Sequence, residues 1–414
     1  MSRNKSRKQN NNKINTIIIA LIIVVISLFI FSIVKNKSNE VKNIPSSKIT
    51  SSLPTSTPTP TSVPIPEPIP DKRVSFSASG DSLIHDTIYL QAKKLADGVV
   101  KQYDFTHIFA NVKDFLSNYD INFLNQETLV NDAFEPSSYP MFSTPVELGQ
   151  ASYDAGYNVF SLSNNHSYDK GALGISATLE FWGSMPQDIL YMGFYNDDNL
   201  MDIKTNTVNG ITFSYVACTD TTNGLPHPQG ATDYIIYTSQ LDVLKQQIEK
   251  AKEISDFVIV SAHWGIEYSL VASDNQKYLA QELANYGADV IIGTHPHVIQ
   301  PIEWITANDG TQTLCVYSLG NFTSAQNMPN RLIGQILTFD TVVTENDKYI
   351  ENVQSHPIVT HRSYAEPNIT TYLLEDYTDE MARSNISIND SNFNLEYIKN
   401  ICSTTISSEF LQLP

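Results

Sequence analysis

Short apolar segments alternate with amphipathic helical segments from residue 74 onward. "INFLN", "NVFSLS", "DFVIVSA" and "DVIIG" are typical of buried strands. The clearest helix is expected in "SQLDVLKQQIEKAKEIS", where Leu241, Leu244 and Ile248 share one face and Ser239 would be the N-cap. This alternation predicts an α/β domain with a largely parallel sheet. Ligands of such sheets bind beyond the carboxyl ends of the strands, so a site is expected there.

The N-terminal region is unlike the rest of the chain. Residues 1–16 are basic, and residues 17–34 form an uncharged apolar run. As a helix, this run would cross about 30 Å of hydrocarbon. A cleaved secretory signal is the alternative, but the run is long and no small-residue cleavage site follows it. We therefore expect a single transmembrane anchor with a cytoplasmic basic tail and an extracellular main domain.

A linker rich in Pro, Ser and Thr is expected at residues 35–72. In an extended form, at about 3 Å per residue, it would hold a domain up to roughly 100 Å from the membrane. The main domain is expected at residues 73–345. Residues 346–414 form a C-terminal extension, whose pattern beyond residue 361 is weaker.

Charge divides the chain sharply. Eleven of the 26 Lys and Arg residues, but only three of the 44 acids, lie in the first 73 residues. The remaining 15 bases and 41 acids give a net charge of −26. Such a surface argues against nucleic acid as a partner, and an anionic ligand would need a local cationic centre.

The cysteine content is odd and low. Cys218, Cys315 and Cys402 are three in number, so at least one of them is unpaired. Their apolar sequence surroundings favour buried thiols over a disulfide, although the expected compartment would permit one.

Polar residues of ligand type follow strand after strand. The candidates are Asp81, His85, Asn125, Glu127, Asn164, Asn165, His166, Asp169, His263, His295, His297 and Asn321. Taken singly, each has an ordinary structural explanation, such as a helix cap, a turn or a packed histidine. Taken together, imidazole, carboxylate and amide oxygen suit a divalent metal such as Mn, Fe or Zn. A shared carboxylate between two ligand groups would suit two ions about 3.5–4 Å apart.

Six motifs in order carry a family resemblance: "GDSLIHD", "LNQET", "SLSNNHSYDKG", "AHWG", "GTHPHVIQ" and "YSLGNF". They resemble the CapA family of bacterial capsule (poly-γ-glutamate) synthesis proteins, within the calcineurin-like metallophosphoesterases. The resemblance covers roughly residues 74–343 and implies a four-layer α/β/β/α sandwich.

The resemblance also implies roles for individual residues. Asp81, Glu127 and His297 would hold one metal, and Glu127, Asn165, His263 and His295 would hold the second. His166 would be the general acid, oriented by Asp169. His85, Asn125, Asn164 and Asn321 are additional candidates.

This chain departs from the general phosphoesterase pattern in three places. Leu83 stands where a histidine ligand is usual, and His85 is a candidate substitute. Glu127 replaces an aspartate, and Ser167 follows His166 where an acid is usual. The first metal position is therefore expected to be short of a ligand.

Three functions follow from the resemblance. The first is a membrane-anchored protein of capsule or poly-γ-glutamate biosynthesis or export, acting on the anionic polymer or a phosphorylated intermediate beside polymer ligase or export proteins. The second is an extracellular metal-dependent phosphoesterase. The third is a non-catalytic polymer-binding scaffold.

Overall fold

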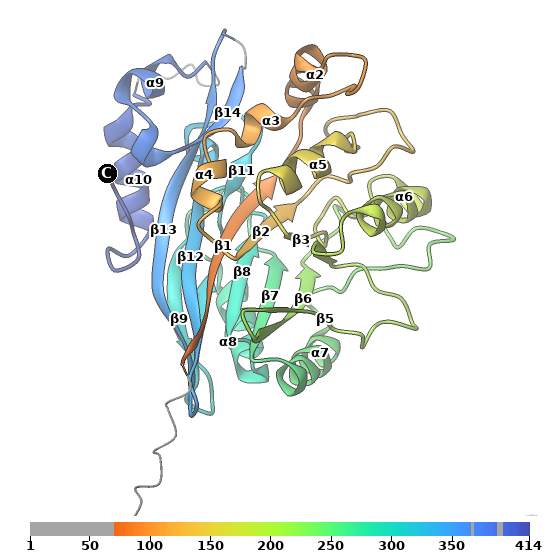
Figure 1. The fold of residues 1–414 in the computed structure, drawn as a ribbon, viewed down its shortest axis with the longest axis vertical. Helices are drawn as coiled ribbons and strands as arrows, with labels where there is room; N and C mark the ends of the chain where they lie inside the picture. Colours follow the sequence, from red (N-terminus) through yellow and green to blue (C-terminus); the bar gives the residue numbers. More distant parts are fainter. Residues whose placement is uncertain (1–69, 366–367, 387–391) are drawn as a thin grey trace, which may run out of the picture. The chain divides into compact units, whose positions relative to one another are not determined.

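Two mixed β-sheets form the centre of the computed structural model, which describes residues 70–365, 368–386 and 392–414 (Figure 1). The basic tail, the apolar run at 17–34 and the linker as far as residue 69 lie outside the described residues. Within the described part, no helix has the length and apolar character needed to cross a membrane.

The larger sheet has eight strands within the described residues, in the order β14-β13-β12-β1-β2-β3-β4, with β11 also paired to β1. Its strands are β1 (Lys72–Ser82), β2 (Ile121–Gln126), β3 (Val159–Ser161), β4 (Leu190–Met192), β11 (Asn321–Thr323), β12 (Ile333–Val343), β13 (Lys348–Arg362) and β14 (Ile369–Leu373). Strands β1 to β4 run parallel, whereas β12, β13 and β14 are antiparallel additions.

The smaller sheet has six strands in the order β5-β6-β7-β8-β10-β9 within the same residues. Its strands are β5 (Lys204–Val208), β6 (Ile211–Thr219), β7 (Phe257–His263), β8 (Val290–Thr294), β9 (Ile302–Thr306) and β10 (Gln312–Val316). Strands β6, β7, β8 and β10 run parallel. The predicted α/β class with substantially parallel sheet is confirmed.

Alternation of side chains along the strands produces three stacked cores. In β7, Phe257 and Ile259 belong to a core that joins both sheets, and Val258 and Val260 belong to a second core shared with helices. Because successive residues of a strand face opposite sides, a strand covered on both faces must be apolar throughout. This explains why "FVIVSA" has no polar alternation.

Helices cover the outer face of each sheet. Those on the larger sheet are α2 (Asp86–Leu95), α3 (Thr106–Phe109), α4 (Lys113–Leu116), α5 (Glu147–Asp154) and α6 (Gly171–Ser184). Those on the smaller sheet are α7 (Leu241–Ile254) and α8 (Asp274–Tyr286). With one core between the sheets and one beneath each helix layer, the layers run α/β/β/α, as expected.

Several local predictions can be compared with the helices and strands. Helix α7 has Gln240 rather than Ser239 as its N-cap, without a side-chain cap. Helix α8 does have a capping box, formed by Ser273 and Gln276, and ends at Gly287 with φ of 112°. The edge strands β4 and β5 were not predicted, because they are short or largely polar.

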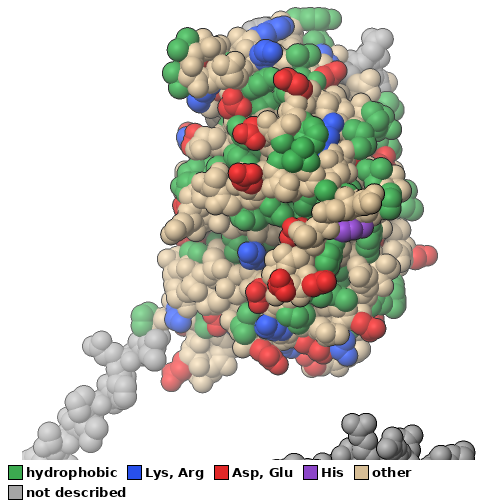
Figure 2. All heavy atoms as spheres, turned by 90° about the vertical axis from the view of Figure 1, so that its right-hand side faces the viewer, with side chains coloured by type: hydrophobic (Ala, Val, Ile, Leu, Met, Phe, Trp, Pro, Cys, Tyr) green, Lys and Arg blue, Asp and Glu red, His purple; other side chains and the backbone are tan. Residues whose placement is uncertain are grey.

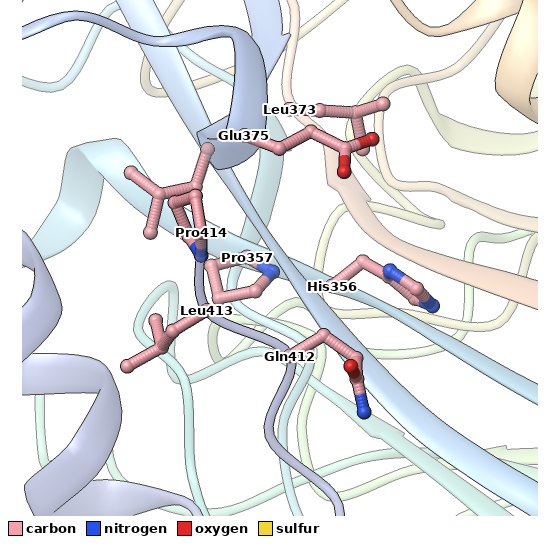
Figure 3. A pocket seen from close by; sticks show the side chains of 8 residues that line it. His356, Pro357, Leu373, Glu375, Gln412, Leu413 and Pro414 are labelled. Atoms are coloured by element: carbon pink, nitrogen blue, oxygen red, sulfur yellow. The ribbon is translucent and has the colours of Figure 1, made fainter.

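The C-terminal residues extend the same core. Helices α9 (Asp379–Ser384) and α10 (Leu395–Thr405) contribute Ala382, Ile398 and Cys402 to the core between the sheets. The chain then runs back along β13, where the Ser355 amide donates to the Phe410 carbonyl at 2.7 Å. Beside this contact, His356 and Glu375 line a small pocket closed by the last residues of the chain (Figure 3).

All three cysteines are buried thiols, as the sequence favoured.

Candidate metal centre

The polar strand ends meet in one buried cluster. Asp81 lies near the end of β1, Glu127 follows β2, His263 ends β7, and His295 follows β8. Within each sheet these strands are parallel neighbours, so their carboxyl ends lie at the same edge. The clustered residues are nearly inaccessible to solvent, which is unusual for so many ionisable groups.

One part of the cluster surrounds Asp81. Its Oδ2 lies 2.9 Å from His297 Nδ1, and its Oδ1 accepts a hydrogen bond from Asn125 Nδ2 at 2.8 Å. His297 Nδ1 is also 3.1 Å from Asn321 Oδ1. Asn321 arrives here because the chain leaves the smaller sheet after β10 and joins β1 as β11, with Asn321 in register with Asp81.

The other part surrounds His263. Its Nε2 lies 2.9 Å from Asn165 Oδ1 and 3.1 Å from His295 Nδ1. Its Nδ1 contacts Thr294 Oγ1 at 3.0 Å. Nitrogen and oxygen atoms of this kind, converging from separate elements, are the donor set expected of a metal site.

Glu127 joins the two parts. Its Oε1 lies 3.8 Å from His263 Nε2 and 3.7 Å from His297 Nε2. The side chain is fully buried, yet neither carboxylate oxygen accepts a hydrogen bond from any described group. A buried carboxylate without a partner is costly, and a cation would remove the cost.

The donor atoms also pass a test of spacing. Atoms of Glu127, His295 and His297 all lie within 4.8 Å of one another. Ligands about 2.1 Å from one ion at tetrahedral angles are roughly 3.4 Å apart, so the contacts of 3–4 Å have the right scale. The residues therefore fit divalent metal.

Burial tunes the imidazoles toward metal binding. It lowers the pKa of His295 to about 4 and holds the pKa of His263 well below its usual value. Both rings are therefore neutral near pH 7, and each keeps a lone pair for a metal. Burial also raises the pKa of the Glu127 carboxyl well above its usual value, with added repulsion from Asp81.

His297 differs from its neighbours. Burial lowers its pKa, but the carboxylates of Glu127 and Asp81 outweigh burial and raise the pKa to about 9. Without a cation, the cluster therefore retains a proton among His297 and its carboxylates. A metal would displace that proton.

A histidine–aspartate dyad stands beside the cluster. His166 Nδ1 lies 2.8 Å from Asp169 Oδ2, and the same oxygen accepts a hydrogen bond from the Phe142 amide at 2.6 Å. The His166 amide donates to Asn164 Oδ1, and the Phe142 ring packs edge-on against the imidazole. These contacts fix the ring orientation and direct Nε2 away from Asp169.

A cleft of about 480 Å³ connects the cluster with solvent. Its lining includes Asn165, His166, Asp169, Tyr268 and His297. The general acid proposed from sequence and two predicted ligands, Asn165 and His297, thus reach the same solvent-accessible space. This is the arrangement needed for a substrate to meet both.

His85 does not join the ligand cluster. Its Nδ1 lies 3.1 Å from the Leu83 carbonyl and 3.2 Å from the Ala325 amide, and the ring lines the cleft. The contacts of Asp81 are instead with His297 and Asn125. His85 is therefore placed to contact a ligand in the cleft rather than to replace the histidine absent at Leu83.

The His-Pro-His turn has an unusual backbone. His295 and His297 have φ of 96° and 57°, in a region that side chains rarely adopt. Upstream, a β-carbon on Gly293 would lie 2.0 Å from the Tyr317 carbonyl oxygen. Glycine thus allows β8 to approach its neighbour, and the turn after it directs both imidazoles into the cluster.

Some cleft residues gave no signal in the sequence. Tyr268, Phe142 and Gln326 line the space, and Thr294 supports His263. Tyr268 and Phe142 lie in loops without metal-ligand character. Only the position of Thr294, directly before His295, could have indicated its role.

The comparisons with known proteins agree on one family. The family model for bacterial capsule synthesis protein PGA_cap matches residues 75–326, more than half of the chain. The chain is 33% identical over 173 residues to the PGA biosynthesis protein CapA of Bacillus subtilis, covering 42% of this chain and 44% of that protein. It is 32% identical over 244 residues to the capsule biosynthesis protein CapA of Bacillus anthracis, covering 55% and 56%.

The matched segments span about half the length of the curated relatives. Among solved structures, Haemophilus influenzae NAD nucleotidase aligns with a TM-score of 0.44 and 11% identity, covering 81% of this chain and 60% of that one. A Candida albicans 5′-nucleotidase aligns with a TM-score of 0.35 and 11% identity, covering 64% and 46%. On the family match and the ordered motifs, this chain belongs to the bacterial capsule synthesis protein PGA_cap family.

Proposed function

We propose that the protein takes part in capsule or poly-γ-glutamate biosynthesis or export through a divalent-metal centre in the cleft. The observation that carries this proposal is Glu127, a fully buried carboxylate with no hydrogen-bond partner among described groups, lying within 4 Å of His263 and His297. Membership of the PGA_cap family supplies the biological setting.

In the proposal, Glu127, Asn165, His263 and His295 hold one ion. Asp81, Glu127 and His297 hold the other, with Asn125 and Asn321 orienting Asp81 and His297. Bound divalent ions supply Lewis-acid stabilisation of negative charge on a ligand oxygen.

The protein's own groups would do the rest. In its imidazolium form, His166 would donate the Nε2 proton to a departing oxygen, and Asp169, which accepts from Nδ1–H, keeps the ring in that orientation. Phe142 packs on the same ring and limits access of water to it.

Charge explains why a metal would matter here. The chain beyond residue 73 has a net charge of −26, and Asp and Glu outnumber Lys and Arg on the face shown in Figure 2. A carboxylate-rich polymer or a phosphorylated intermediate would be repelled at long range, although salt screens this beyond about 8–10 Å. Metal ions would provide the positive charge at short range.

The location belongs to the proposal as well. We place residues 17–34 in the cell membrane as a single-pass anchor and residues 35–72 outside it as a spacer. The catalytic cleft would then work on the outer side, near the membrane proteins that polymerise or export the chain.

A phosphoesterase is the second candidate function, favoured by the His166–Asp169 pair. A histidine held 2.8 Å from a buried aspartate is oriented as a proton-transferring imidazole needs to be, and metal binding alone does not call for it. The substrate would be a cell-surface or nutrient phosphoester.

The deciding experiment measures metal and turnover on the full chain purified in mild detergent. We expect bound Mn, Fe or Zn by mass spectrometry, and metal-dependent hydrolysis of p-nitrophenyl phosphate that His166→Ala abolishes. Metal without turnover would favour a binding role in polymer synthesis. A chain without metal, whose His295→Ala variant also supports normal polymer production in cells, would refute the metal centre.

A further inference from the structure

Arg331 is a cation stacked on Tyr268, a residue of the cleft wall. It lies in the short helix η1 (Pro329–Leu332), and its guanidinium carbon is 3.3 Å from the centre of the Tyr268 ring. Among the described residues, no carboxylate forms an ion pair with Arg331.

Tyr268 lies close to both Arg331 and His297, a residue of the candidate metal centre. Its ring lines the cleft, and its centre lies 6.1 Å from the centre of the His297 ring. The guanidinium carbon is therefore no farther from the His297 ring centre than the sum of these two distances. A ligand spanning one small ring or a few bonds could reach from His297 to Arg331.

Hydrogen bonds fix both members of this pair relative to the site. The Tyr268 amide donates to the carbonyl of Pro296, the residue between the two ligand histidines, at 2.7 Å. Asn321 donates from Nδ2 to the Arg331 carbonyl at 2.9 Å, and its Oδ1 is 3.1 Å from His297 Nδ1. These hydrogen bonds hold Tyr268 and Arg331 in place relative to His295 and His297.

Stacking also prepares Arg331 for an anion. A guanidinium lying flat on an aromatic ring keeps its N–H groups at its edge, where they can form two parallel hydrogen bonds to a carboxylate or phosphate. The stacking restricts the side chain before the ligand arrives, so less conformational entropy is lost on binding.

We infer that Arg331, held on Tyr268, is a second anion subsite, and that the cleft selects ligands with two anionic groups a short distance apart. One group would bind at the metal cluster, and the other, a carboxylate or a phosphate, would bind Arg331. This inference rests on the proposed function, because the first group needs the metal centre.

Glu267 provides an internal contrast. It lines the same cleft and lies next to Tyr268, so its carboxylate opposes an anion at this position. Removing the positive charge of Arg331 and removing the negative charge of Glu267 should therefore shift affinity in opposite directions. A purely structural role for the stacked pair predicts no such reversal.

The test uses three ligands with the same ring: phenyl phosphate, 4-carboxyphenyl phosphate and 1,4-phenylene bisphosphate. Their dissociation constants are measured by calorimetry on the Mn-loaded full chain carrying His166→Ala, which is expected not to hydrolyse them, in mild detergent. We expect the two ligands that have an anionic group at each end of the ring to bind about tenfold more tightly than phenyl phosphate. A gain of this size is typical of a charged hydrogen-bonded contact. Whichever of these two ligands binds more tightly shows whether Arg331 prefers a carboxylate or a phosphate.

Variants then assign the gain. Arg331→Gln should remove the tenfold difference in affinity and leave the dissociation constant of phenyl phosphate unchanged. Glu267→Gln should increase the difference in affinity. Arg383→Gln, which removes an exposed positive charge on α9, is the matched control and should change nothing. Equal binding of all three ligands by the His166→Ala protein, or equal weakening of all three in Arg331→Gln, would overturn the inference while leaving the metal centre intact. Failure of phenyl phosphate to bind the Mn-loaded protein would overturn the proposed function and this inference with it.

Discussion

His297 Nδ1 lies 2.9 Å from Asp81 Oδ2, although 216 residues separate them in the chain. The contact joins the first strand of the larger sheet to the turn after β8 of the smaller sheet. The site therefore exists only when the two sheets are packed together, and its metal is expected to stabilise the sandwich as a whole.

Replacement of Glu127 by Gln should affect the stability of the metal-free and the metal-loaded protein differently. Without metal, the amide replaces a buried carboxyl group that has no hydrogen-bond partner, so stability should be unchanged or higher. With metal at about 100 times the dissociation constant, the parent protein gains about 2.7 kcal/mol, and the variant should lose most of that gain. Thermal denaturation with EDTA and with Mn measures both.

The control for this prediction is Glu249→Gln, an exposed acid on α7. It should respond to Mn like the parent protein. An equal Mn-induced gain in Glu127→Gln and the parent would show that Glu127 is not a ligand.

Substitution of Asp169 by Asn should affect turnover without affecting metal. Asp169 contacts His166 and the Phe142 amide, and none of the ligand contacts involves it. If His166 donates a proton, loss of its orientation should lower the rate of phosphoester hydrolysis by about 10²-fold or more. Metal content, measured by mass spectrometry, should stay at the parental level, and reduced metal content would argue for a structural role instead.

The fold class and the clustering of the polar strand ends were predictable from sequence because both depend on local patterns. Strands buried on both faces must be apolar, and the order of polar strand ends is written directly in the chain. Glu127, His263, His295 and His297 could thus be named before their contacts were known. The family resemblance supplied their grouping, which spacing alone could not provide.

Other parts depended on tertiary packing that no local pattern records. Asn321 follows β10 closely in the sequence, but the chain changes sheets between them, and Asn321 begins β11 beside Asp81. Tyr268 and Arg331 belong to a loop and a short 3₁₀ helix, where composition carries no signal of stacking. His85 was a reasonable ligand by spacing, yet its backbone contacts hold it in the cleft wall.

Replacement of Gly293 by Ala should destabilise the protein through steric conflict alone. The added carbon would meet the Tyr317 carbonyl oxygen at 2.0 Å, and both lie in the smaller sheet or its continuation. Overpacking of this kind costs on the order of 3 kcal/mol. Gly183→Ala in α6 is the control: its nearest neighbour is 3.4 Å away, so helix propensity should make it neutral or stabilising by up to about 1 kcal/mol. Urea denaturation compares the two, and equal stabilities would contradict the packing described for β8.

Acid should destabilise the protein in part through His356, a residue of β13 remote from the metal centre. Burial lowers its pKa from 6.5 to about 4, and its ring packs against Phe115 beside the pocket that Glu375 also lines (Figure 3). The folded state binds this proton less readily than the unfolded state. The contribution is therefore fully present above pH 6.5 and is lost as the pH falls toward 4. The pKa difference corresponds to roughly 3 kcal/mol as an upper value. His356→Gln should be less stable than the parent at pH 7.5, because it loses packing, but its stability should fall less steeply between pH 6.5 and pH 4. Urea denaturation of both proteins in the presence of EDTA across this range measures the difference in slope. Parallel pH profiles would show that the pKa of His356 is the same in the folded and unfolded states.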